Sequence, residues 1–178
     1  MSLSRCRVLC FRLSAGQELV TEVTARCREA ALQAAFVVTC VGSTSACRLR
    51  LASTPDGRTE NFVSSSDFME ICSLVGTVSG SGVHLHVTLG RADGSALAGH
   101  VVSLTVQTTA EVVLGEAEQL VFDREPDTRT GYCELVVRNR TSINWLWRTV
   151  PEAGQLMFDG EPETQTGYCE LVVRNRTP

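Results

Sequence analysis

The chain has 178 residues, of which 43% are hydrophobic and 20% are charged, as in one ordinary globular domain with a core. Its formal net charge is −4, and all 16 basic residues are arginines without a dense basic run. Nucleic-acid affinity depends mainly on basic side chains that neutralise phosphates, so this composition counts against DNA binding by the chain alone. No apolar run approaches the ~20 residues of a membrane-spanning helix.

The N-terminal segment is interrupted by Arg5, Arg7 and Arg12, and it therefore lacks the apolar block of a secretory signal. Residues 5–13 instead predict a first strand. We expect an intracellular protein, located in the cytoplasm or the nucleus.

Disulfides are not expected in such a compartment, although the chain contains eight cysteines. Cys27, Cys40, Cys47 and Cys72 lie within apolar patterns, which predicts that they serve as small core side chains.

A helix is predicted at residues 17–32, where apolar residues recur at helical spacing, with Ser14 as the candidate N-cap. A buried strand follows at residues 35–41, and residues 42–45 (Gly-Ser-Thr-Ser) are predicted to end it. A second, half-exposed strand begins at Cys47.

Residues 53–66 are rich in Ser, Thr, Pro and Gly, which predicts a surface loop. Further strands are expected at residues 68–78, in two arms around residues 82–104, and at residues 109–114. Strands thus outnumber helices, which predicts an α+β fold with a mainly antiparallel sheet and one principal helix.

All three histidines of the chain lie in two neighbouring arms that alternate at period two. A two-residue turn at Asp93-Gly94 would turn His100 to the opposite face of the sheet from the other two. A three-residue loop with Gly94 in the left-handed conformation would place His86 opposite His100. His84 would then share that face, and we favour this second register.

Three neutral imidazoles on one face predict a divalent-metal site at His84, His86 and His100. Zinc accepts three nitrogen ligands and leaves a fourth position for water or a carboxylate, although Cu(II), Ni(II) and Fe(II) also accept imidazole. The alternative is a polar strand face whose histidines hydrogen-bond to neighbours or to a partner subunit.

Residues 122–141 recur almost unchanged at residues 158–177, with differences only at Arg124/Gly160, Asp127/Glu163 and Arg129/Gln165. Both copies carry the same predicted closing strand, and the sheet has one position for it, so the two copies compete for that position. We expect the first copy to take it, because its shorter connection costs less closure entropy.

The order of motifs resembles the plant and prokaryote conserved (PPC) domain, also called the DUF296 family. The matching segments are residues 12–19 (RLSAGQEL), 41–45 (VGSTS), 49–50 (LR), 68–76 (FMEICSLVG), 82–86 (GVHLH), 93–94 (DG), 99–100 (GH), 109–112 (TAEV) and 130–132 (TGY). The likeness covers residues 7–138.

This resemblance implies a PPC-like α+β domain at residues 1–141 that assembles as a homotrimer. Residues 142–178 lie outside the family pattern, as a C-terminal extension that duplicates residues 116–141. In plants the domain accompanies AT-hook motifs in DNA-binding proteins. The chain lacks an Arg-Gly-Arg-Pro hook, so DNA or chromatin association is expected only by analogy with the family.

By position, Arg50 and Glu70 match recurrent charged residues of the family, and we expect them to contact a ligand or an interface. For Arg50 a structural ion pair is favoured over recognition of an anion. The first functional hypothesis is a stand-alone trimeric binding or interaction module with a three-histidine metal or ligand site. The second is a metal-dependent enzyme of unknown substrate, with Glu70 or Glu111 as candidate bases. Surface or interfacial ion pairing is the alternative role for both carboxylates.

Overall fold

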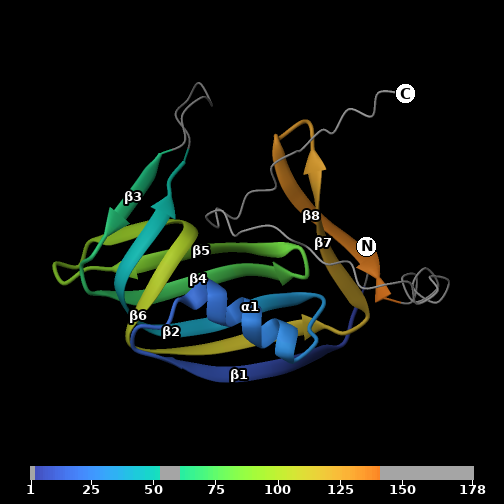
Figure 1. Cartoon of the computed structure of the whole chain (residues 1–178), viewed down its shortest axis with the longest axis horizontal. Coiled ribbons are helices and arrows are strands. Elements are labelled where there is room, and N and C mark those ends of the chain that lie inside the picture. The colour runs from blue at the N-terminus through green and yellow to red at the C-terminus, as the bar shows by residue number, and fades with distance from the viewer. Residues whose placement is uncertain (1–2, 53–60, 141–178) are drawn as a thin grey trace, which may run out of the picture.

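The computed structural model describes residues 3–52 and 61–140 as a mainly antiparallel α+β fold with one helix (Figure 1). The elements are β1 (Cys6–Ser14), α1 (Leu19–Glu29), β2 (Ala35–Arg50), β3 (Phe62–Ser65), β4 (Met69–Ser79), β5 (Gly82–Gly90), β6 (Ala96–Ala117), β7 (Leu120–Asp127) and β8 (Tyr132–Asn139). The predicted fold class is confirmed. No helix among these residues is long and apolar enough to cross a membrane.

Six strands form the main sheet, in the order β1-β6-β5-β4-β2-β3, and β6 also pairs with β2. The pairings of β2, β4, β5 and β6 therefore form a closed circuit, with β1 and β3 as outer strands. β7 and β8 pair only with each other, as a separate hairpin that projects from the main sheet in Figure 1.

The core lies between the sheet and α1. The helix buries Leu19, Val23 and Cys27 against it. Leu49, Leu85, Leu89, Leu104 and Leu114, on β2, β5 and β6, are fully buried. Buried leucine and valine alternate with half-buried or exposed residues along much of β5 and β6, which is the pattern of a sheet with one face on the core.

The helix is shorter than predicted, and its N-cap is Glu18. The Glu18 carboxylate accepts hydrogen bonds from the backbone N–H groups of Val20 (3.2 Å) and Thr21 (2.7 Å). Ser14 instead ends β1, where it pairs with Thr109. The prediction of Ser14 as the cap was wrong because strand pairing continues through that residue.

Two predicted strand breaks are absent. β2 continues through residues 42–45, where it keeps a regular register against β4 and shifts its register against β6. Residues 96–117 likewise form one strand in place of two. The predicted loop at residues 53–66 contains β3, which pairs with the end of β2; residues 53–60 lie outside the described part of the chain.

The first copy of the duplicated segment forms β7 and β8, and its closing strand does not join the main sheet. We expected this strand to pair within the main sheet. That prediction was wrong, because β8 pairs with β7 instead. The second copy, with the rest of the extension at residues 142–178, lies outside the described residues.

The seven described cysteines are free. Cys27, Cys40 and Cys47 are buried as predicted, whereas Cys72 is exposed. The prediction for Cys72 was wrong because its side chain lies on the outer face of β4.

Candidate metal centre

The connection between β5 and β6 is a three-residue loop. Arg91 N donates to Ser95 O (2.8 Å), which closes the loop, and Gly94 has a φ of +83°, a left-handed conformation that favours glycine. The Asp93 carboxylate accepts hydrogen bonds from the Ser95 backbone N–H (2.9 Å) and hydroxyl (2.6 Å). Local polar contacts and one glycine therefore set the register of the hairpin.

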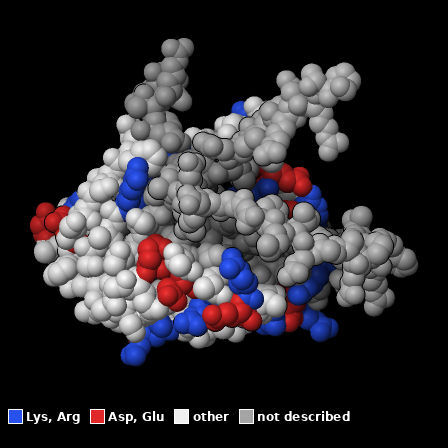
Figure 2. Space-filling view, viewed as in Figure 1, with Lys and Arg blue, Asp and Glu red and all other residues white. Residues whose placement is uncertain are grey.

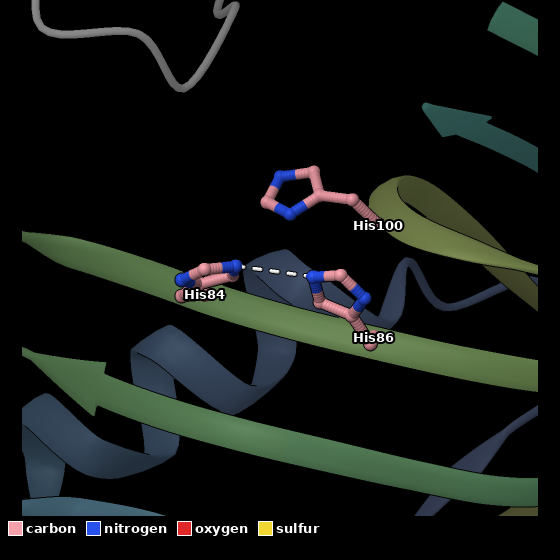
Figure 3. A group of neighbouring side chains, drawn as sticks. All are labelled: His84, His86 and His100. Atoms are coloured by element: carbon pink, nitrogen blue, oxygen red, sulfur yellow. Dashed lines mark hydrogen bonds between the residues drawn. The ribbon is translucent and has the colours of Figure 1, made fainter. Parts of the chain in front are cut away.

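In this register His86 lies directly opposite His100. His84 lies two residues before His86 on β5 and so shares its face of the sheet. Figure 3 shows the three imidazole rings turned toward one another from these two strands. The predicted register is confirmed, and the two-residue alternative is excluded.

The three rings are spaced closely enough to share an ion. Their centroids are 5.1 to 5.4 Å apart, and one ligand nitrogen from each lies within 4.8 Å of the others. His84 Nε2 and His86 Nε2 are 3.1 Å apart and share a hydrogen bond, so one of them carries a proton that a bound metal ion would displace (Figure 3). Two nitrogens bound to one tetrahedral zinc ion are about 3.3 Å apart, so this pair already has ligand spacing.

The remaining ring also fits a metal ligand. Within residues 3–52 and 61–140, His100 Nδ1 is buried and has no hydrogen-bond partner. A buried nitrogen without a partner is unfavourable, and a metal ion is one group that would satisfy it.

Two of the three imidazoles are held in the neutral form that metals require. Burial lowers the pKa of His100 to about 4, and the positive charge of Arg50 adds to this effect. Burial and then the charge of Arg124 lower the pKa of His84 from its usual value. Both rings are therefore neutral at pH 7, with a lone pair available for a metal.

Arg50 is brought to this site. It lies directly opposite His100 where β2 pairs with β6, so the two side chains leave the same face of the sheet. Its guanidinium carbon lies 5.0 Å from the centre of the Tyr132 ring, a cation–π distance.

Glu70 and Glu111 are not brought to the histidines. Glu70 pairs with Gly90, five residues along β4 from Val75, the residue that faces His86. At the usual rise per residue this is a separation of about 16 Å. Glu111 is exposed and lies opposite Arg12 on β1.

Sequence reasoning missed Arg124, which reaches the site from β7. Its Nη2 donates to Thr77 Oγ1 (2.9 Å), and Thr77 lies opposite His84 where β4 pairs with β5. One signal in the sequence pointed to this residue. The two copies of the duplicated segment differ at only three positions, and Arg124/Gly160 is the difference that most changes the side chain.

Among curated proteins, the chain is 41% identical over 130 residues to the "Bifunctional protein GlmU" of Synechococcus sp. strain JA-3-3Ab. The match covers 72% of this chain and 20% of that protein. It is 40% identical over 129 residues to the protein of the same name from strain JA-2-3B'a(2-13), again with 20% of that protein covered. The chain thus spans about a fifth of the length of these relatives.

Among solved structures, a hypothetical protein from Salmonella cholerae-suis has a TM-score of 0.72 and 35% identity, covering 78% of this chain and 98% of that one. A metal-containing protein from Archaeoglobus fulgidus has a TM-score of 0.66 and 24% identity, covering 76% and 99%. The likeness to the Archaeoglobus fulgidus protein is evidence for a shared fold only.

The model of one family, described as the Plants and Prokaryotes Conserved (PCC) domain, matches residues 2–118. This span includes all three histidines and every strand of the main sheet. The chain therefore belongs to the Plants and Prokaryotes Conserved domain family, as its motifs had indicated.

Proposed function

We propose that this chain is a binding or interaction module that holds one divalent metal ion at His84, His86 and His100. The observation that carries the proposal is the convergence of three ring nitrogens within 4.8 Å, two of them already 3.1 Å apart. Zinc is the preferred ion, because it takes three nitrogen ligands readily. The metal-containing protein of Archaeoglobus fulgidus, which has the same fold, supports a metal in this fold family.

The test is elemental analysis of the native oligomer, purified without a histidine tag. We expect close to one zinc ion per chain, and we expect the double variant His84→Ala/His86→Ala to lose it. Thr88→Ala is the matched control, because Thr88 lies on β5 two residues beyond His86 and offers no ligand of the predicted kind. Metal-free wild-type protein that binds no added zinc would contradict the proposal.

We also propose that the module is a homotrimer. The β7–β8 hairpin forms a sheet of only two strands, which on its own is marginally stable in water. Its β8 strand leaves Leu135 and Val137 on one face, 39% and 47% exposed. Contact with another copy would cover this face and stabilise the hairpin.

A metal-dependent enzyme is the second candidate. Three protein ligands leave one coordination position for water, whose proton a metal ion makes easier to remove. Glu134, on β8, is the carboxylate whose charge acts on His84. It replaces Glu70 and Glu111 as the candidate base, and Glu134→Gln should abolish any metal-dependent hydrolysis without releasing the metal.

DNA association is not part of the proposal. Figure 2 shows arginine and acidic side chains interspersed on the face in view, without an extended basic surface. A phosphate backbone requires a row of positive charges along its path. We propose the same intracellular location, in the cytoplasm or the nucleus, that the sequence favoured.

A further inference from the structure

Two arginines from different strands lie beside the three histidines. Arg50 stands opposite His100 and stacks on the Tyr132 ring at 5.0 Å. Arg124 is held beside His84 by its 2.9 Å hydrogen bond to Thr77. Each guanidinium is thus positioned by a contact outside the histidine cluster.

The Arg124 guanidinium has a second anchor. Its Nη1 donates to the backbone carbonyl oxygen of Cys133 on β8, at 3.4 Å. The carbonyl belongs to the same hairpin that carries Tyr132, the ring on which Arg50 stacks. The β7–β8 hairpin therefore orders both arginines at one edge of the site.

The charges around the histidines are mainly positive. Arg50 stands opposite His100, and Arg124 is hydrogen-bonded to Thr77, which lies opposite His84. A bound divalent ion would raise the local positive charge further. A site of this kind is completed most favourably by an anion.

We infer that the site recognises a small oxyanion, a carboxylate or a phosphate ester, with one oxygen at the open metal position and the others facing Arg50 and Arg124. The inference rests on the proposed metal site. A guanidinium stays charged at all working pH values and offers paired N–H donors that match both kinds of oxyanion. A neutral amide of the same shape interacts more weakly than a carboxylate with both the metal ion and the arginines.

The experiment uses untagged full-length protein loaded with Co²⁺, whose visible absorption reports changes at the metal. Acetate and methyl phosphate are titrated separately, with acetamide as the neutral match for acetate. We expect saturable spectral shifts with acetate, methyl phosphate or both, and none with acetamide. The anion with the lower apparent Kd shows whether the site prefers a carboxylate or a phosphate ester.

Arg50→Gln and Arg124→Gln should each raise the apparent Kd for the anion about tenfold or more, because each removes a charged hydrogen-bond donor. Co²⁺ stoichiometry should stay the same in both variants. Arg28→Gln, on the exposed face of α1, is the matched control and should bind like the wild type.

Two results separate the possible failures. If Co²⁺ binds but the anions shift no band, or if both arginine variants bind the anions as tightly as the wild type does, the oxyanion inference is wrong and the metal site stands. If Co²⁺ does not bind at all, both the metal site and the oxyanion inference are wrong.

Discussion

Glu116 is the one charged side chain that is fully buried among the residues that the structure describes, with 1% of its surface exposed. Its Oε2 accepts a hydrogen bond from Arg7 Nε (2.5 Å), and its Oε1 accepts one from the backbone N–H of Gln33 (2.9 Å). Arg140 Nη1 lies 3.7 Å from Oε1. One carboxylate thus links β1, β6 and the segments that follow α1 and β8.

We expect Glu116→Gln to lower the free energy of unfolding by about 1–3 kcal/mol. The amide can still accept from Gln33, but it loses the charge that pairs with Arg7, whose side chain is half exposed. Urea unfolding measures the effect. Glu111→Gln, an exposed residue on the same strand, should change stability by less than about 0.5 kcal/mol; equal effects would show that burial of Glu116 is unimportant.

Burial raises the pKa of the Cys40 thiol to about 11, and burial together with Glu116 does the same for Cys27. At pH 7 each should carry about a hundredfold less thiolate than a thiol at the ordinary value of 9.0. Iodoacetamide followed by peptide mass spectrometry should therefore modify exposed Cys6 and Cys10 long before these two. Equal rates in the folded protein would contradict the buried assignment.

The raised thiol pKa values also make the free energy of unfolding depend on pH. The folded-state pKa is raised, so these thiols contribute their full stability below pH 9 and lose it progressively as the pH rises toward 11. Unfolding free energy measured across that range should fall, and replacement of Cys40 by Ala should reduce the slope.

The histidine triad could be predicted from residues alone, because strand alternation and a loop with Gly94 determine which side chains face each other. Arg124 could not, because a side chain on β7 approaches β4 only through the tertiary arrangement of the hairpin. Glu70 shows the converse: a charged residue in a matching motif lies too far along β4 to join the site.

At the scale of elements, local composition predicted where strands lie but not where they end. The residues 42–45 look like a strand terminator, yet β2 passes through them because β6 and β4 supply partners on both sides. Tertiary pairing overrides a local preference for a turn. Helix α1 shows the same limit, since its start depends on where β1 stops pairing.

Gly76 on β4 pairs with Leu85, next to His84, and its lack of a side chain allows β5 to approach closely. Its φ is +142°, and a Cβ atom there would overlap the backbone carbonyl oxygen of His84. We expect Gly76→Ala to push β5 away, to lower unfolding free energy by more than about 2 kcal/mol, and to weaken zinc binding. Urea unfolding and zinc titration measure the two effects.

Gly80→Ala is the control for this prediction, because Gly80 lies in the adjoining turn and an added Cβ meets nothing within 4 Å. It should retain both stability and zinc affinity. If Gly76→Ala retained them as well, the close approach of β4 and β5 would not support the site.

At the scale of the whole molecule, the main sheet with α1 contains the core, and the β7–β8 hairpin stands apart with its own two-stranded sheet. The hairpin nevertheless supplies Arg124, Glu134 and Tyr132 to the surroundings of the histidines. Site and proposed assembly are therefore linked, because the same hairpin that borders the metal centre presents an apolar face outward.

We expect light scattering of the untagged protein to give a mass of about 58 kDa, three times the 19.3 kDa chain, as for a cyclic trimer. The double variant Leu135→Asp/Val137→Asp places two charges on the outward face of β8 and should shift the mass toward one chain. Arg28→Glu changes the net charge by the same amount on the exposed side of α1, and it should remain trimeric. A wild-type protein that stays at 19.3 kDa across concentrations would exclude the trimer, and a trimer that tolerates both aspartates would place its contacts away from the hairpin.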